Sequence, residues 1–228
     1  MIKVGLSGGL FTGYEYVAQI FEKYGVPVFD ADVALKFILN YRDDIARRIR
    51  IEFGIDIYKS GLIDGRKLNT TQKFDKLIDI AELEIIRMYE TFRFANKDAA
   101  YTIFKSGILY ERQLEKSMDY NITVFRPKQD RIHDMKTETG MRLTEVHDLL
   151  KSEMEPLNKN NSASWTIHNY WTISNSPRRK VGDGMDLNSN DTLDEQVLSI
   201  HKKIESKSIN NLLINKFDDS LLYKNITY

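Results

Sequence analysis

The chain has 228 residues, of which 42% are hydrophobic, and it contains 33 basic residues, 33 acidic residues and no cysteine. This length and apolar content suffice for one sizeable core, or for one domain with a small appendage. The balanced charge provides no global field that would attract nucleic acid or an anionic membrane, so neither is expected as a partner. The lack of cysteine excludes disulfides, thiolate metal sites and a cysteine nucleophile.

The N-terminus enters an apolar strand directly, without a segment typical of a secretion signal. No apolar run approaches the roughly 20 residues of a membrane span, so a cytoplasmic location is expected. The chain is rich in Asn, Ile, Lys, Asp and Tyr, which is typical of proteins from AT-rich genomes such as those of many tailed phages. For a phage protein, the expected location is the host cytoplasm or the virion.

The first 24 residues have the pattern strand, glycine-rich loop, helix. Residues 2–6 alternate as a buried strand does, and residues 15–24 have helical periodicity. Between them lies a loop whose glycines are Gly8, Gly9 and Gly13. Such a loop lets backbone N–H groups and a helix N-terminus converge on an anion.

Gly8 and Gly13 have the G-x-x-x-x-G spacing of a Walker A phosphate loop, but the Lys and Ser/Thr that follow in that motif are replaced by Tyr14 and Glu15. Two interpretations follow for this loop. Gly8, Gly9, Gly13, Tyr14 and Glu15 bind a nucleotide phosphate, or they form a strand-to-helix turn that has the shape of the phosphate loop without its chemistry. The second is favoured because no cation follows the last glycine.

A second apolar run, residues 26–29, ends in Asp30-Ala31-Asp32. Parallel α/β sheets place their sites at the carboxyl ends of strands, so Asp32 is a candidate catalytic base and Asp30 a candidate substrate-binding residue. A helix N-cap role competes with both, because Asp is a preferred N-cap. No metal site is predicted, since the four histidines have no metal-ligand spacing: His133, His147, His168 and His201.

The rest of the chain alternates helical and strand patterns. Helices are predicted over 33–53, 72–94, 142–159 and 193–204, and strands over 99–104, 122–125 and 165–174, with an exposed insertion over 177–191. This alternation predicts an α/β fold with a parallel sheet of about five strands and helices on both faces. The tail over 206–228 has an apolar stripe that needs covering, so it is predicted to contact a protein partner or a second copy of the chain.

Residues 5–38, GLSGGLFTGYEYVAQIFEKYGVPVFDADVALKFI, resemble the start of the dephospho-CoA kinase family, in which a strand leads to T-G-G-I-G-S-G-K-S-T-V-A, a helix, a glycine and V-I-D-A-D. Later motifs follow in the family's order: Gly61–Leu68 resembles G-x-L-D-R-x-x-L, Ile108–Glu111 resembles L-L-F-E, and Glu153–Lys159 resembles Q-M-P-L-x-x-K with one inserted residue. The resemblance extends over about residues 1–204.

The resemblance implies a P-loop kinase of the nucleoside monophosphate kinase type over residues 1–205, using ATP and Mg²⁺. It also implies a helical acceptor-binding insertion at about 33–95 and a lid-like segment at about 128–145. The family pattern retains Asp30 and Asp32 here, and Lys36 stands for a family arginine in substrate binding. The departures are Tyr14 and Glu15 in the loop, Phe11 for its third glycine, Lys105 for a strand-end Asp, and Glu138 near the position of a lid arginine.

These departures predict a catalytically degenerate, non-enzymatic member that acts as a binding, scaffold or structural component without a cofactor. Two alternatives stay open: an active kinase that uses ATP and Mg²⁺ on dephospho-CoA or a nucleotide, with Asp32 as catalytic residue, and a regulatory protein that binds a nucleotide without turnover. Because positions 15 and 105 lie near each other in the implied fold, an ion pair between Glu15 and Lys105 is expected to close the phosphate pocket.

Overall fold

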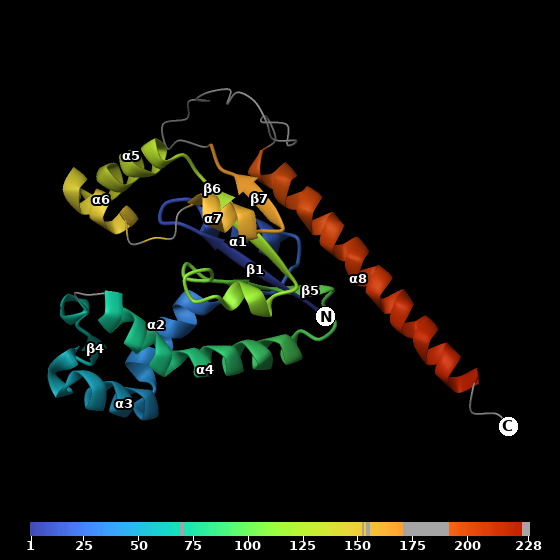
Figure 1. The fold of residues 1–228 in the computed structure, drawn as a ribbon, viewed down its shortest axis with the longest axis horizontal. Coiled ribbons are helices and arrows are strands. Elements are labelled where there is room, and N and C mark those ends of the chain that lie inside the picture. The colour runs from blue at the N-terminus through green and yellow to red at the C-terminus, as the bar shows by residue number, and fades with distance from the viewer. Residues whose placement is uncertain (69–70, 152, 154–155, 171–191, 225–228) are drawn as a thin grey trace.

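A computed structural model describes residues 1–68, 71–151, 153, 156–170 and 192–224 (Figure 1). Its centre is a sheet of five strands: β1 (Ile2–Gly8), β2 (Val28–Asp30), β5 (Tyr101–Lys105), β6 (Tyr120–Phe125) and β7 (Trp165–His168). The strand order is β2-β5-β1-β6-β7, and every pairing is parallel. The prediction of a parallel sheet of about five strands is therefore confirmed.

Helices cover both faces of this sheet because its strands carry apolar side chains on both sides. On one face, α1 (Tyr14–Lys23) and α8 (Leu193–Lys224) bury Phe21, Val197 and Ile204 against the strands. On the other face, α2 (Ala31–Tyr41) and α4 (Thr71–Ala95) form a second core around Phe29 and Phe104. Since β1 lies between β5 and β6, the loop after β1 occupies the point where the chain changes direction across the sheet.

The predicted helix over 33–53 is wrong as a single element, because it consists of α2 and α3 (Asp43–Phe53). The break is at Arg42, whose backbone is extended with φ −96° and ψ 109°. Its guanidinium pairs with Asp44 at 3.0 Å and with Glu84 of α4 at 2.5 Å.

A short hairpin follows, β3 (Tyr58–Lys59) and β4 (Leu62–Ile63), and 3₁₀ turns lie at Ile55–Ile57, Gly65–Lys67 and Leu114–Ser117.

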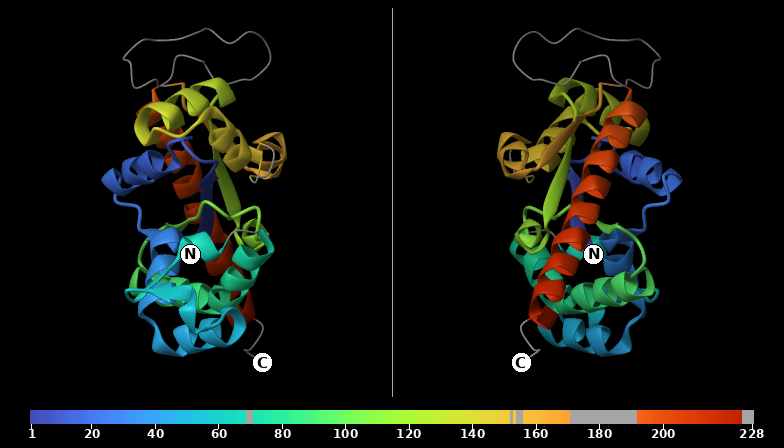
Figure 2. Two further views of the ribbon diagram at one scale, coloured as in Figure 1. Left: turned by 90° about the vertical axis from the view of Figure 1, so that its left-hand side faces the viewer. Right: turned by 90° about the vertical axis from the view of Figure 1, so that its right-hand side faces the viewer.

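Three helices lie between β6 and β7: α5 (Lys128–Thr139), α6 (Leu143–Lys151) and α7 (Pro156–Ser162). The predicted helix over 142–159 corresponds to parts of α6 and α7. The predicted strand over 165–174 ends at His168, and its last residues lie outside the described part of the chain, as does the predicted insertion over 177–191. In Figures 1 and 2, α5 and α6 lie at one end of the molecule and α2 to α4 at the other.

The predicted helix over 193–204 and most of the predicted tail form one continuous helix, α8. Its first half packs on the sheet, and Ser208 Oγ still donates a hydrogen bond of 3.1 Å to the Ala100 carbonyl. Figure 1 shows the helix continuing beyond the edge of the sheet toward the C-terminus. Among the helices of the described residues, none combines the length and apolar character that a membrane span requires.

Candidate functional site

The loop between β1 and α1 has the compact shape of a phosphate loop. Gly13 has φ 83°, and Phe11 has φ 59°. The loop therefore has this left-handed conformation at Phe11 although Phe11 is not a glycine. The conformation costs a residue with a Cβ atom roughly 1–2 kcal/mol. The Thr12 hydroxyl donates to the Gly9 carbonyl at 2.8 Å, and a Cβ atom on Gly8 would lie 2.2 Å from that hydroxyl. The interior of the loop is therefore occupied by Thr12, which is buried.

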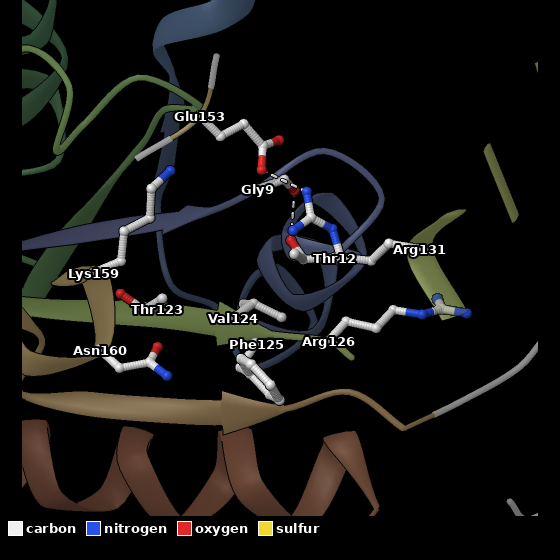
Figure 3. A pocket seen from close by; sticks show the side chains of 10 residues that line it. All are labelled: Gly9, Thr12, Thr123, Val124, Phe125, Arg126, Arg131, Glu153, Lys159 and Asn160. Atoms are coloured by element: carbon white, nitrogen blue, oxygen red, sulfur yellow. Dashed lines mark hydrogen bonds and ion pairs between the residues drawn. The ribbon is translucent and has the colours of Figure 1, made fainter. Parts of the chain in front are cut away.

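A carboxylate and a guanidinium from distant segments close the mouth of this loop (Figure 3). Glu153 lies between α6 and α7, and its Oε1 accepts a hydrogen bond of 2.5 Å from the Leu10 N–H. Its Oε2 lies 2.5 Å from Nη2 of Arg131, a side chain of α5 that is 3% exposed. Arg131 Nε in turn donates to the Leu10 carbonyl at 2.6 Å. A Cβ atom on Gly9 would lie 2.6 Å from the Glu153 carboxylate and 2.7 Å from the Arg131 guanidinium, so a larger residue here would displace these side chains.

A second group of polar side chains lies at the carboxyl ends of β2 and β5. Asp30 and Lys105 are direct neighbours in the strand register, and Lys105 Nζ lies 2.7 Å from Asp30 and 3.8 Å from Asp32. The expected ion pair between Lys105 and Glu15 is therefore wrong. Strand register places Asp30 opposite the lysine, whereas Glu15 is an exposed residue on α1.

Asp32 accepts several hydrogen bonds within the chain. The Tyr14 hydroxyl donates to Oδ2 at 3.1 Å, and the Gly107 N–H donates to Oδ1 at 3.1 Å. Burial raises the pKa of Tyr14 well above its usual value, and the negative charges of Asp32 and Glu15 raise it further. Tyr14 therefore remains a neutral donor to Asp32 at any physiological pH.

Asp30 is the N-cap of α2, because its Oδ1 accepts from the N–H groups of Asp32 and Val33 at 3.1 and 3.0 Å. The capping alternative is thus confirmed for Asp30, which also forms an ion pair with Lys105. Lys36 is exposed on α2 and takes no part in the ion pairs of Lys105, and Glu138 is exposed on α5. The structure thus brings Asp30, Asp32 and Tyr14 together around Lys105, while Lys36 and Glu15 form none of the ion pairs of Lys105.

The chain leaves little space beside the loop. A cavity of about 10 Å³ lies there, with room for about one water molecule, and Figure 3 shows its lining residues. Its three cationic side chains each pair with a carboxylate: Arg126 with Asp134, Arg131 with Glu153, and Lys159 with Glu111 at 2.6 Å. A second cavity of about 10 Å³ lies between Asp32 and α4.

Reasoning from the sequence did not identify Arg131 and Glu153 as residues that contact the loop. The family motifs contain both Glu111 and Lys159, but nothing in the motifs indicated that these two residues pair with each other. In the structure, this ion pair connects the segment after β5 with α7.

A family model described as dephospho-CoA kinase matches residues 2–175. The chain is 28% identical over 178 residues to the dephospho-CoA kinase of Clostridium perfringens, covering 74% of this chain and 89% of that protein. It is 23% identical over 214 residues to a dephospho-CoA kinase domain-containing protein of Danio rerio, covering 90% and 86%.

Two solved structures show the same fold. The Thermus thermophilus protein TT1252 has a TM-score of 0.64 at 20% identity, covering 75% of this chain and 90% of that one. The dephospho-CoA kinase from Campylobacter jejuni has a TM-score of 0.53 at 14% identity, covering 89% and 96%. With the parallel sheet described above, these similarities confirm the predicted P-loop kinase-like α/β fold.

Proposed function

The chain belongs to the dephospho-CoA kinase family, and we propose that it is a catalytically degenerate member that serves as a binding, scaffold or structural component. The observation that carries this proposal is the contact between Tyr14 and Asp32. A buried phenol occupies the first helical position after the loop, where a Walker A motif has its lysine. That phenol is hydrogen-bonded to the candidate catalytic carboxylate.

Phosphoryl transfer depends on positioning and on neutralisation of phosphate charge, chiefly by a lysine and Mg²⁺. Tyr14 supplies no positive charge, and Glu15 adds a negative charge where the motif has a hydroxyl ligand for Mg²⁺. The cations nearest the site are already neutralised, Lys105 by Asp30 and Arg131 by Glu153. This charge arrangement favours a member without phosphoryl transfer.

The residues around the loop also do not fit a bound nucleoside triphosphate with Mg²⁺. The Leu10 N–H is already bonded to Glu153, and the same carboxylate pairs with Arg131 beside the loop. Asp32 already accepts hydrogen bonds from Tyr14 and Gly107, so a substrate hydroxyl would have to compete with these two donors for its oxygens.

A turnover assay tests this proposal. The purified chain is incubated with ATP, Mg²⁺ and dephospho-CoA, and ADP release is measured beside Asp32→Asn as the matched control and the Clostridium perfringens dephospho-CoA kinase as the reference enzyme. We expect the same background rate for the wild-type chain and Asp32→Asn. ADP release that requires dephospho-CoA and disappears in Asp32→Asn would overturn the proposal.

An active kinase acting on dephospho-CoA or a nucleotide is the second candidate, favoured by the family match and by the presence of both Asp30 and Asp32. In that case Lys105 would have to leave Asp30 to neutralise a phosphate, and Lys105→Met would abolish the rate. A regulatory protein that binds a nucleotide without turnover is the third candidate. It would give measurable ATP binding and no ADP.

We further propose that the C-terminal part of α8 contacts a protein partner or a second copy of the chain. Ser208 is buried and bonded to Ala100, so the part that lies beyond the body begins after this residue. Deletion of 211–228 removes the apolar positions of the tail and keeps Ser208. We expect an unchanged thermal midpoint and a lower mass in light scattering, or loss of a captured partner. Unchanged association after this deletion would refute the proposed contact.

A further inference from the structure

Glu153 approaches the loop from a segment far away in the sequence. It follows α6, and its carboxylate reaches the backbone of Leu10, which is 143 residues earlier in the chain. In Figure 3, this carboxylate lies beside Gly9 and points toward the guanidinium of Arg131. Each oxygen has its own donor, the Leu10 N–H for Oε1 and Arg131 Nη2 for Oε2.

These two donors are of the kind that proteins use for oxyanions. Backbone N–H groups in a glycine-rich loop and a planar guanidinium both bind carboxylate and phosphate oxygens. The guanidinium of Arg131 is held in position beside the loop, because its Nε also donates to the Leu10 carbonyl and its side chain is 3% exposed. The loop and Arg131 therefore form an oxyanion site in which the bound oxyanion is Glu153.

The geometry points to Glu153 as a resident anion, which occupies the oxyanion site of the loop with the chain's own carboxylate and excludes free phosphate and pyrophosphate. This inference deepens the proposed function and rests on it, because it explains how a loop without its lysine stays closed. It also assigns Glu153 a second effect, since its side chain contacts both Arg131 of α5 and Leu10 of the loop and so connects these two elements.

The Gln of the family's Q-M-P-L motif suggests a conservative variant for the test. Glu153→Gln keeps the size of the side chain but removes its charge, whereas Glu153→Ala empties the site. Glu138→Gln and Glu138→Ala are the matched controls, because Glu138 is an exposed carboxylate on α5 and its removal changes the net charge equally. Each full-length variant is titrated with inorganic pyrophosphate in a calorimeter, with circular dichroism as the check on folding.

We expect Glu153→Ala to bind pyrophosphate at least about tenfold more tightly than the wild-type chain, a difference of about 1.4 kcal/mol. The Glu138 variants should match the wild-type chain. The double variant Glu153→Ala with Arg131→Ala should lose the gain, because the guanidinium is then missing. Equal affinities of the wild-type chain and Glu153→Ala would overturn the inference.

A second measurement covers the case in which Glu153→Ala does not fold. A short hydrogen bond to a carboxylate shifts an amide proton downfield, so the Leu10 amide resonance should move upfield in Glu153→Gln and stay in place in Glu138→Gln. An unmoved resonance would contradict the contact. Both results are independent of turnover: ADP release by the wild-type chain would overturn the proposed function, whereas the pyrophosphate and Leu10 measurements decide the role of Glu153.

Discussion

The hydroxyl of Tyr14, at the start of α1, donates a hydrogen bond of 3.1 Å to Oδ2 of Asp32, at the start of α2. The two residues come from different faces of the sheet and meet at the carboxyl ends of its strands. Tyr14 is 8% exposed, and its ring also lies 5.4 Å from Lys105 Nζ. The phenol thus joins the loop after β1 to the carboxylates after β2.

Replacing Tyr14 by Phe should lower the free energy of unfolding by about 1–2 kcal/mol, because Asp32 loses a donor in a half-buried position. Urea unfolding followed by circular dichroism measures the change. Tyr16→Phe is the matched control, since Tyr16 is 48% exposed on the same helix and should change stability by less than about 0.5 kcal/mol. Equal stability of the two variants would show that the Tyr14 hydrogen bond contributes nothing.

Replacing Lys105 by Met should cost about 2–3 kcal/mol, because Asp30 and Asp32 then lie close together without a counter-charge. This is below the cost for a fully buried pair, since both carboxylates are partly exposed. Lys36→Met is the control on the exposed face of α2. Adding Asp30→Asn to Lys105→Met should restore part of the loss, because Asn also caps a helix. No difference between the Lys105 and Lys36 variants would contradict the prediction.

His168, at the end of β7, should make stability depend on pH. Burial lowers the pKa of His168 in the folded chain, where its ring stacks on Tyr170. The unfolded chain, with an ordinary pKa of about 6.5, therefore takes up the proton first as the pH falls. The free energy of unfolding should decrease as the pH drops below about 6.5 and be fully recovered above it.

His168→Asn removes this titration, so the difference in stability between pH of about 7.5 and about 5.5 should be smaller in the variant. Thermal unfolding of both proteins in the same two buffers measures it. Parallel pH profiles for the wild-type chain and His168→Asn would rule out this histidine as the source.

The parts of the fold that could be predicted from the sequence are those with local causes. The alternation of Val4 and Leu6, the glycines of the loop and the stop at Gly25 each depend on neighbours in the chain, and β1, the loop and α1 follow from them. Asp30 as a helix N-cap is local in the same way, because its two partners, Asp32 and Val33, lie two and three residues later in the chain.

The contacts that close the loop have no local cause. Glu153 and Arg131 reach Leu10 across 143 and 121 residues, and no periodicity or spacing indicates that such segments meet. The expected partner of Lys105 was wrong because the register of β2 against β5 determines which side chain lies beside the lysine. A one-residue shift would place Asp30 on the other side of the sheet. Register depends on the assembled core and is not encoded in either strand alone.

The most direct test of the central claim, that the loop has lost its nucleotide chemistry, is calorimetric titration of the wild-type chain with ATP, with and without Mg²⁺. The protein concentration must be high enough to detect a dissociation constant of about 1 mM, a binding free energy of about −4 kcal/mol. We predict no binding heat in either condition, because Glu153 already bonds the Leu10 N–H and Arg131, and Tyr14 supplies no positive charge. Saturable binding that requires Mg²⁺ would contradict the claim and would mean that Glu15 has taken over a metal-binding role.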